Sequence, residues 1–418
     1  MEESATATPL DTIQRRARIR LVLGFALVVA AVLIDPLRGQ PIQLGPMRVA
    51  VVVVGVLMVV LALAARRPRL RRATVAFIAL GSVGYGSLLI VELVLAILSP
   101  PQATRMALEG LRWRTMEDPQ VGFRSTPGWS GVHDDGIVRA EYRHNSRGDR
   151  DDDEPVAGAT RRILLLGDSF TYGQTLAREE TIEARIEARA PFDAYNLGVS
   201  GYAAIHSLRR FEQSDWWRGD DVVYLFFNND IHSGSREWDY VRVYDGYSVN
   251  RRNSDGTAFT DEQLETQRRR AIGANPNVLT AKLSAWLALS RLRKTAMSLF
   301  DRELRLTGMP SWALDPIVVD EAVRDTLAMR AHAEELGAKF HLVVLPAPIE
   351  GGERTWSQGT GSFITAARAA GLEPIEDLLH QVERSDYVAH DGHFSAAGAD
   401  KVAQLLLHVV DPNRPAAP

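Results

Sequence analysis

A short apolar run at residues 163–166 places the strongest constraint on the fold, because Gly167, Asp168 and Ser169 end it at once. A continuous apolar run followed by glycine and small polar residues is typical of a central parallel strand that leads into a loop. In open α/β sheets, ligands bind beyond the carboxyl ends of such strands. Ser169 is therefore a candidate nucleophile, although Gly-Asp-Ser by itself is also a common turn sequence.

The same strand pattern recurs along the rest of the chain. Further strands are predicted at residues 192–197, 222–227, 340–345 and 372–375. Helices are predicted at residues 179–190, 203–211, 318–336, 363–370 and 396–409. Strands that alternate with helices form a parallel sheet with helices on both faces, so we expect a three-layer α/β/α domain over residues 161–412.

Two irregular segments adjoin or interrupt this domain. Residues 100–160 are rich in turn-forming residues and predict a partly ordered connector, with one hairpin near residues 138–144 and a solvated acidic loop at 149–154. We assign the connector no chemistry. Residues 231–312 break the rhythm and predict a lid-like insertion, where elements that select the substrate normally lie. Residues 413–418 are expected to be disordered.

Three apolar runs, at residues 21–34, 49–65 and 73–98, dominate the first hundred residues. So many apolar side chains are difficult to bury in a soluble domain. We therefore predict a membrane anchor over residues 1–99 that contains three transmembrane helices. A cleaved signal peptide is the alternative for the first run, but no small-x-small cleavage site follows it at residues 35–37.

Basic clusters at residues 15–20 and 66–72 flank alternate ends of these runs. By the positive-inside rule both clusters are cytoplasmic. The amino terminus is then cytoplasmic, and everything after Leu98 is extracytoplasmic, in the periplasm or at the cell surface. Glu92 lies about 9 Å from the end of the third helix at 1.5 Å per residue, so we expect its side chain to reach the outer interface.

The composition excludes several classes of site. Lys and Arg number 48 against 52 Asp and Glu, and this near-neutral balance offers no footprint for nucleic acid. The absence of cysteine excludes disulfides, thiolate metal sites and a cysteine nucleophile together. The sequence Gly-x-Ser-x-Gly occurs nowhere, so a nucleophile elbow of the α/β-hydrolase type is not supported.

An activated serine needs a base, a group that orients the base, and donors for the oxyanion that forms. Four short blocks, each placed where a strand ends or before the last helix, supply these groups. The blocks are Gly167-Asp168-Ser169-Phe170, Asn196 to Gly201, Asn228-Asn229-Asp230, and Asp391-Gly392-His393. In kind and order they resemble the blocks of the SGNH hydrolases, also called the GDSL esterase/lipase family, over about residues 161–412.

The resemblance implies a flavodoxin-like SGNH-hydrolase domain and a set of site residues. Ser169 resembles the nucleophile, His393 the general base, and Asp391 the acid that orients the base. The amides of Ser169 and Gly201 and the side chain of Asn229 resemble the oxyanion hole. Asp168 and Asp230 resemble supporting residues, and no metal or cofactor is implied.

Two positions depart from the family pattern. The third block is commonly Gly-x-Asn-Asp, and Phe227 stands at the glycine position, where it would reshape the pocket wall. The last block is commonly Asp-x-x-His, whereas His390 lies three residues before His393 and Asp391 only two. Either Asp391 reaches the imidazole from a tighter turn, or a backbone carbonyl orients His393.

Two other interpretations concern the histidines. His390, Asp391 and His393 could hold a divalent metal together with Asp168, as in a phosphoesterase, but the set lacks the bridging carboxylates of a two-metal site. The histidines without a partner pattern are predicted to be structural or surface residues, namely His206, His232, His332, His341, His380 and His408.

The sequence thus predicts an extracytoplasmic serine esterase that hydrolyses O-acyl esters of a cell-surface glycan or lipid. The resemblance makes O-acetyl esters the expected substrates. One alternative is an O-acyltransferase with the same triad, which needs a membrane partner that supplies the acyl group. Another is a non-catalytic module that binds glycan.

Overall fold

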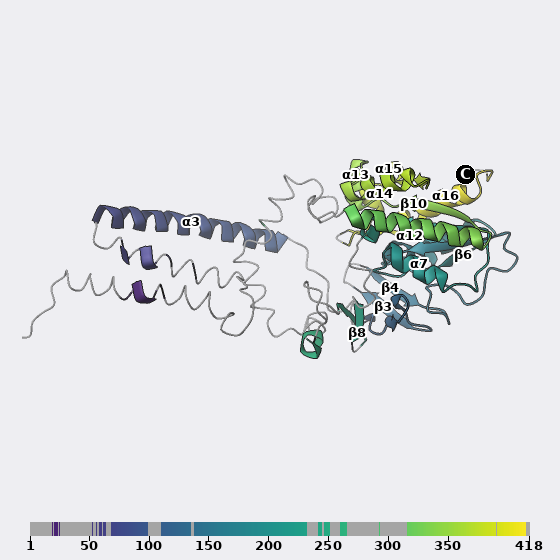
Figure 1. Cartoon of the computed structure of the whole chain (residues 1–418), viewed down its shortest axis with the longest axis horizontal. Coiled ribbons are helices and arrows are strands. Elements are labelled where there is room, and N and C mark those ends of the chain that lie inside the picture. Colours follow the sequence, from purple (N-terminus) through teal and green to yellow (C-terminus); the bar gives the residue numbers. More distant parts are fainter. Residues whose placement is uncertain are drawn as a thin grey trace, which may run out of the picture. The chain divides into compact units, whose positions relative to one another are not determined.

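The computed structural model describes residues 68–98, 110–134, 138–231, 241–244, 246–250, 260–265, 316–389 and 391–414, and isolated positions at 19, 21–23, 25, 52, 56, 58–60, 62–63 and 292. The chain divides into two compact units (Figure 1). One comprises Met1–Pro100 and Pro276–Met297, and the other comprises Pro101–Asn275 and Ser298–Pro418.

The first unit contains α3 (Pro68–Leu98), which matches the third predicted membrane helix. Its segment Arg72–Val94 has a mean hydropathy of 1.9, and in the described part of the chain it is the one helix long and apolar enough to cross a membrane. The structure therefore does not support three such helices. The other two predicted spans lie mostly outside the described residues, and the few described positions within them are helical.

Glu92 does not take the place expected from the sequence. Its side chain is fully buried, and its carboxylate accepts a hydrogen bond from the backbone N–H of Leu292 at 2.7 Å. The prediction that Glu92 reaches the outer interface is thus wrong in this structure. The reason is a partner 200 residues further along the chain, which no local pattern reveals.

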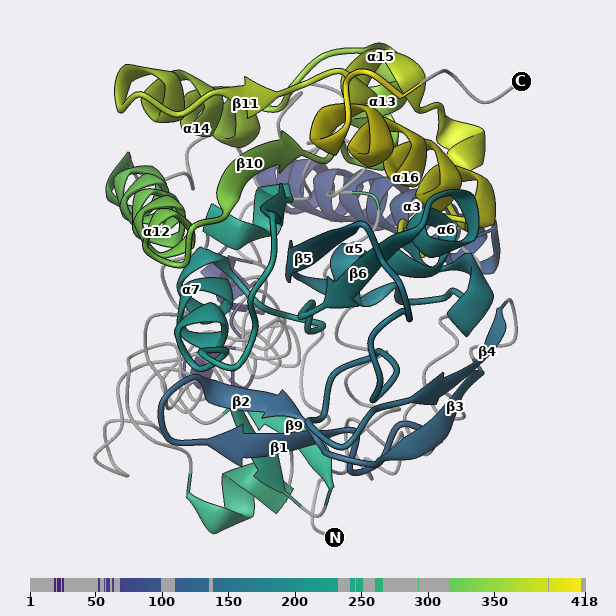
Figure 2. The same ribbon diagram turned by 90° about the vertical axis from the view of Figure 1, so that its right-hand side faces the viewer.

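The second unit is built on a five-stranded parallel sheet in the order β11-β10-β7-β5-β6 (Figure 2). Its strands are β5 (Arg161–Gly167), β6 (Phe192–Asn196), β7 (Asp221–Phe226), β10 (Lys339–Val344) and β11 (Pro374–Ile375). This is the flavodoxin-like strand order. The predicted parallel α/β sheet is confirmed.

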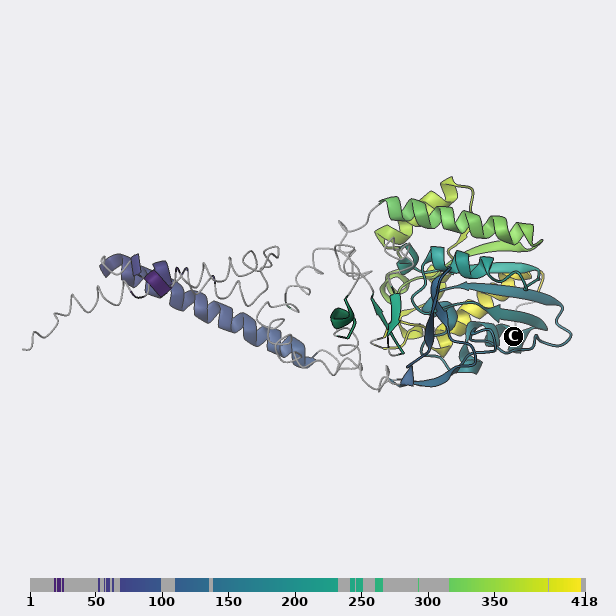
Figure 3. The ribbon, with the colours of Figure 1, turned by 60° about the horizontal axis from the view of Figure 1, so that its bottom comes forward.

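Helices cover both faces of this sheet. Successive side chains of a strand point to opposite faces, so a strand that is apolar at every position has apolar side chains to bury on both. Leu164 and Leu166 of β5 pack with α7 (Ala204–Glu212), α12 (Pro316–Glu335) and α14 (Gln358–Ala369). Figure 3 shows α12 running alongside the sheet.

On the opposite face, Ile163 and Leu165 pack with α6 (Ile182–Arg189) and α16 (Ala396–Val410). The domain therefore has the predicted three layers. Short helical turns complete it: α5 (Ser169–Tyr172), η2 (Arg178–Glu180), η3 (Asn228–Ile231), α13 (Pro348–Glu353), α15 (Leu378–Gln381) and η6 (Arg384–Asp386).

The connector contains two antiparallel hairpins rather than the single one predicted. They are β1 (Thr115–Asp118) with β2 (Gly122–Ser125), and β3 (Ser130–Asp134) with β4 (Arg139–Arg143). The connector belongs to the same compact unit as the sheet, so the predicted boundary at residue 161 is not a boundary of that unit. The predicted solvated loop at 149–154 is wrong at its start, because Asp149, Arg150 and Asp151 are buried.

The predicted insertion at residues 231–312 is described only in part. β8 (Val241–Tyr244) pairs with β9 (Tyr247–Asn250), and residues 261–265 are helical. The backbone N–H of Val243 donates to Glu117 of β1 at 3.1 Å, so this hairpin lies against the connector. The helix expected from 279 to 306 and the tail from 415 to 418 lie outside the described residues, apart from Leu292.

Candidate active site

Ser169 lies at the carboxyl end of β5, as the first residue of the one-turn helix α5. Asp168 caps this turn, since its carboxylate accepts the backbone N–H of Phe170 at 2.9 Å. Gly167 is required just before, because a Cβ there would lie 2.2 Å from the hydroxyl oxygen of Thr171. The turn therefore leaves the hydroxyl of Ser169 at the edge of the sheet.

His393 connects Ser169 to Asp391. The Oγ of Ser169 lies 2.8 Å from Nε2 of His393, and Nδ1 of His393 is hydrogen-bonded to Oδ1 of Asp391. A neutral imidazole that donates from Nδ1 to the carboxylate accepts at Nε2 from the serine hydroxyl. This is the geometry a general base needs.

A tight turn allows Asp391 to reach the imidazole although it lies only two residues before His393. Gly392 adopts a φ of 92°, a region that favours glycine. The same carboxylate accepts the backbone N–H of His393 at 3.2 Å. Of the two alternatives left open by the sequence, the structure has the contact from Asp391.

The environment of Asp391 favours its charged form. Burial raises the pKa of this carboxyl, but the hydrogen bonds from the ring and the backbone of His393 help to outweigh burial, and the resulting pKa lies below its ordinary value. Asp391 is therefore an anion at neutral pH. It can stabilise the imidazolium that forms when His393 accepts a proton.

Aromatic rings pack around the imidazole. The ring centroid of Phe170 lies 5.0 Å from that of His393 and 4.9 Å from that of Phe394. Phe227, at the glycine position of the family that the sequence resembles, packs on Phe170 with the ring centroids 4.1 Å apart and the rings tilted by 38°. Phe227 thus extends the aromatic packing that supports His393.

The three oxyanion donors expected from the resemblance lie after three adjacent strands. Ser169 follows β5, Gly201 follows β6, and Asn229 follows β7 in the turn η3. Gly201 has a φ of 90°, so its place in the loop also favours glycine. Burial is the largest effect on the pKa of Asp168 and raises it, and the side chain of Asn229 is near enough to this carboxyl to lower that pKa in part.

Asp168 and Asp230 are buried carboxyls beneath these loops. Burial raises the pKa of Asp168, and the backbone hydrogen bond from Phe170 is the largest of the effects that lower it. Burial and the nearby charge of Asp168 raise the pKa of Asp230 well above its ordinary value.

Asp230 also orders the turn that carries Asn229. It accepts the hydroxyl of Tyr224 at 2.9 Å and the backbone N–H of Phe227 at 3.1 Å. Both acids therefore support the loops of the site rather than face it as free groups.

The metal alternative is not supported by the described residues, which contain no group of three or more His, Asp or Glu side chains able to hold a metal ion. His390 lies outside the described residues, so its part in that alternative stays untested. Among the histidines predicted to be structural or surface residues, His206 is buried and His341 pairs with Asp221 at 2.8 Å. His232 lies outside the described residues.

Sequence reasoning missed the residues that the connector contributes around the site. The ring of Phe123 packs on Tyr202 beside Gly201, and the hydroxyl of Tyr202 donates to the carbonyl of Phe123 at 2.9 Å. Burial raises the pKa of Asp391, the contacts of His393 lower it more, and the nearby His133 of β3 lowers it slightly further. The sequence of β4, Arg-Ala-Glu-Tyr-Arg, alternates charged and less polar residues, and this alternation matches its alternating exposed and buried side chains. Such a pattern indicates a strand that packs on a core with one face.

Comparison with known proteins gives only distant structural similarity. No protein-family model and no curated protein matches the sequence. TesA is 15% identical with a TM-score of 0.34, and the similarity covers 60% of this chain and 98% of TesA. A protein from Desulfitobacterium hafniense DCB-2, described as a lipolytic protein of the G-D-S-L family, is 11% identical with a TM-score of 0.31, covering 60% of this chain and 98% of that protein.

LAE5, an alpha/beta hydrolase enzyme from the metagenome of Lake Arreo, Spain, is 12% identical with a TM-score of 0.33. This similarity covers 62% of the present chain and 98% of LAE5. Identities and TM-scores this low carry no functional argument. The case for a function rests on the geometry of Ser169, His393 and Asp391.

Proposed function

We propose that this protein is a membrane-anchored serine esterase that hydrolyses O-acyl esters, with O-acetyl esters of a cell-surface glycan or lipid as its substrates. The observation that most supports the proposal is the hydrogen-bonded series Asp391, His393 and Ser169. It lies at the carboxyl edge of a parallel sheet, beside the loops that carry Gly201 and Asn229.

The reaction follows from these positions. The Oγ of Ser169 attacks the ester carbonyl while Nε2 of His393 takes its proton, and Asp391 stabilises the imidazolium. The amides of Ser169 and Gly201 and the carboxamide of Asn229 donate to the oxyanion. Collapse of the intermediate expels the alcohol, which takes the proton from His393.

Water then completes the cycle. It attacks the acyl-serine while His393 takes one of its protons, and the acid is released as Ser169 recovers its proton.

The candidate span in α3 and the basic clusters beside the apolar runs support an anchor with the catalytic unit outside the cytoplasm. The chain has no cysteine, so one introduced cysteine reports its own location. Arg139→Cys suits this purpose, because the side chain of Arg139 is 69% exposed. Labelling by a membrane-impermeant maleimide in intact cells is expected. Labelling only after lysis would contradict the orientation.

The decisive test is hydrolysis of a short-chain aryl ester by the full-length chain in detergent. We expect Ser169→Ala to lower kcat by more than about 10⁴-fold and Asp391→Ala by about 10³- to 10⁴-fold. Ser130→Ala changes an exposed serine of β3 and serves as the matched control. Turnover that survives Ser169→Ala would refute the proposed nucleophile.

The alternatives predict different outcomes in the same assay. An acyltransferase would turn over an activated ester faster when a sugar acceptor is added, and it would yield the acylated sugar. A glycan-binding module would show no turnover, and its binding of glycan would be unchanged by Ser169→Ala.

A further inference from the structure

Arg150 and Asp151 are consecutive charged residues of the connector, and both are buried, with exposed fractions of 1% and 7%. A buried charge is costly unless it is paired or hydrogen-bonded. Their partners therefore indicate why these side chains lie inside the domain. The partners belong to the two loops that carry the predicted nucleophile and an oxyanion donor.

Arg150 binds the turn that carries Ser169. Its guanidinium donates to the backbone carbonyls of Tyr172, Gly173 and Leu176, with a distance of 2.9 Å to the first. These carbonyls lie at and just beyond the end of α5, where helical turns leave acceptors without intrahelical partners. The guanidinium also lies over the ring of Tyr142, 4.2 Å from its centroid.

Tyr142 of β4 contacts the segment that follows α5. Its hydroxyl accepts the backbone N–H of Thr175 at 2.8 Å. Thr175 has a φ of 74°, which is a strained conformation for a β-branched residue. Such a conformation persists only where neighbouring contacts hold it, and here the connector supplies them.

Asp151 binds the strand that leads into the loop of Gly201. Its carboxylate accepts the backbone N–H of Asn196 at 2.6 Å and pairs with Arg178 at 3.2 Å. The side chain of Asn196 in turn joins both loops. It donates to the carbonyl of Thr171 in α5 at 2.8 Å and accepts the N–H of Gly198 at 2.9 Å.

We propose that Arg150 and Asp151 are positioning residues, which hold the turn of Ser169 and the loop of Gly201 in register for the reaction. This inference rests on the proposed esterase function. The two residues touch no substrate, and they act through backbone groups of the loops. A displacement of about 1 Å at a reacting group can cost about 100-fold in rate, so loss of these contacts should appear in catalysis as well as in stability.

The test separates positioning from folding by measuring the fraction of molecules whose Ser169 is reactive. A fluorophosphonate that labels the activated serine gives the fraction of full-length enzyme with a competent Ser169, and kcat is then expressed per labelled site. For Arg150→Met and Asp151→Ala we expect kcat per site to fall by about 10- to 100-fold, with KM changed less than about threefold. Asp151→Asn keeps an oxygen acceptor for Asn196 and should remain within about fivefold of the parent enzyme.

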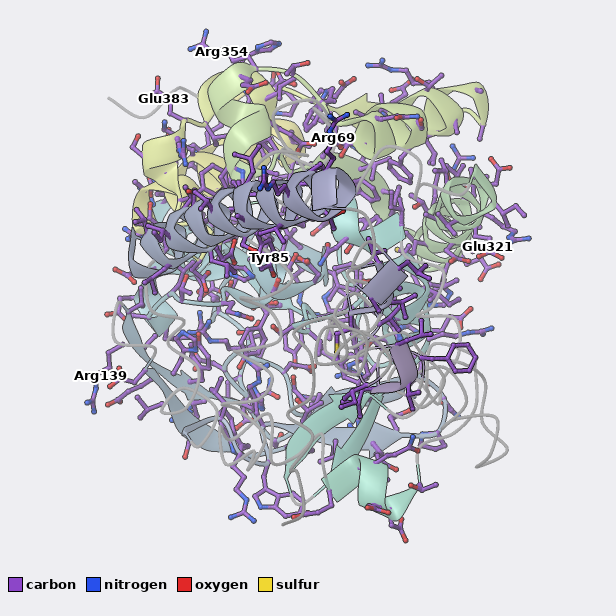
Figure 4. The ribbon with its side chains drawn as sticks, turned by 90° about the vertical axis from the view of Figure 1, so that its left-hand side faces the viewer. Arg69, Tyr85, Arg139, Glu321, Arg354 and Glu383 are labelled. Atoms are coloured by element: carbon purple, nitrogen blue, oxygen red, sulfur yellow. The ribbon has the colours of Figure 1, made fainter. Side chains whose placement is uncertain are left out.

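Arg139→Met is the matched control. It changes an arginine of the same connector whose side chain points outward from β4 (Figure 4) and pairs only loosely with Asp134, at 3.8 Å. Its kcat per site should equal that of the parent enzyme.

The proposal is overturned if Arg150→Met and Asp151→Ala reduce only the labelled fraction or Tm and leave kcat per site unchanged. If Arg150→Met does not fold, the same comparison of kcat per labelled site is made with Arg150→Lys and the two Asp151 variants. If the parent chain has no esterase turnover, the proposed function fails on its own. The positioning role is then tested by the rate at which the fluorophosphonate labels Ser169. Slower labelling of the variants is expected, and equal rates in parent and variants overturn the positioning role.

Discussion

Protonation of His206 is expected to destabilise, in mild acid, the unit that contains the five-stranded sheet. His206 is buried on α7, stacked on the ring of Tyr202 with centroids 5.3 Å apart. Its Nδ1 accepts the backbone N–H of Ala203 at 3.1 Å, which only the neutral ring can do. Burial lowers the pKa of His206 from 6.5 to about 4.

The size of the effect follows from the difference between the folded and unfolded pKa. The unfolded chain takes up this proton below about pH 6.5, whereas the folded chain does so only near pH 4. The stability associated with neutral His206 is therefore fully present above pH 6.5 and is lost as the pH falls towards 4. A shift of this size corresponds to about 3 kcal/mol in total, of which about 2 kcal/mol is lost by pH 5.

The assay compares the parent chain with His206→Asn, which keeps an acceptor for Ala203 but does not titrate. Urea unfolding is followed at pH 8 and pH 5 through the intrinsic tryptophan fluorescence, to which the fully buried Trp217 contributes. The difference in unfolding free energy between parent and variant should shift by about 2 kcal/mol, against the parent, between the two pH values. Other groups that titrate in this range cancel in the difference, among them Glu187, whose pKa burial raises to about 7.

Parallel behaviour of the two proteins, within about 0.5 kcal/mol, would refute this reasoning. It would mean that the ring of His206 takes up its proton as easily in the folded chain as in the unfolded one. An NMR titration of His206 in the intact protein gives an independent measurement. A pKa near 6.5 would contradict the expected effect in the same way.

Three further predictions concern the site and its frame. Asn229→Ala should lower kcat about 10²- to 10³-fold with little change in KM, and an unchanged kcat would remove Asn229 from the oxyanion hole. Gly392→Ala should cost about 1 to 2 kcal/mol of stability. The cost comes from the φ of 92° and not from a clash, because the atom nearest to the added Cβ lies at an ordinary 3.8 Å. The kcat should also fall, and a fully active variant would contradict the need for this turn. A chain that starts at residue 110 should yield a soluble catalytic unit, whereas one that starts at residue 155 should aggregate without Tyr142 and Arg150; equal yields and equal Tm would show the connector to be dispensable.

The sheet could be predicted because its strands are encoded locally. The runs at residues 163–166 and 222–227 are apolar without interruption, and glycine follows the first and asparagine the second. Since the carboxyl ends of parallel strands meet at one edge, a local pattern was enough to predict that Ser169, Gly201 and Asn229 lie at the same edge of the sheet. The sequence could not reveal how their side chains are held.

The connector could not be predicted because its contacts are between residues far apart in the chain. Asp149 forms an ion pair with Arg210, 61 residues further on, and also accepts the hydroxyl of Tyr195 at 2.8 Å. An acidic run read alone is typical of a solvated loop, because charged side chains are seldom fully buried without a partner. The partners of these acidic side chains lie on β6, α7 and η2. They come close to residues 149–151 only when the sheet and its helices have folded.

One backbone angle decides whether the carboxylate of Asp391 can reach the imidazole of His393. The spacing Asp-x-His left two arrangements open, and the residue types favoured neither. In the structure, the left-handed conformation of Gly392 lets one carboxylate bind both the backbone N–H and Nδ1 of His393. A residue with a side chain at position 392 would resist that angle, so the glycine, rather than the distance along the sequence, brings the carboxylate of Asp391 to the imidazole of His393.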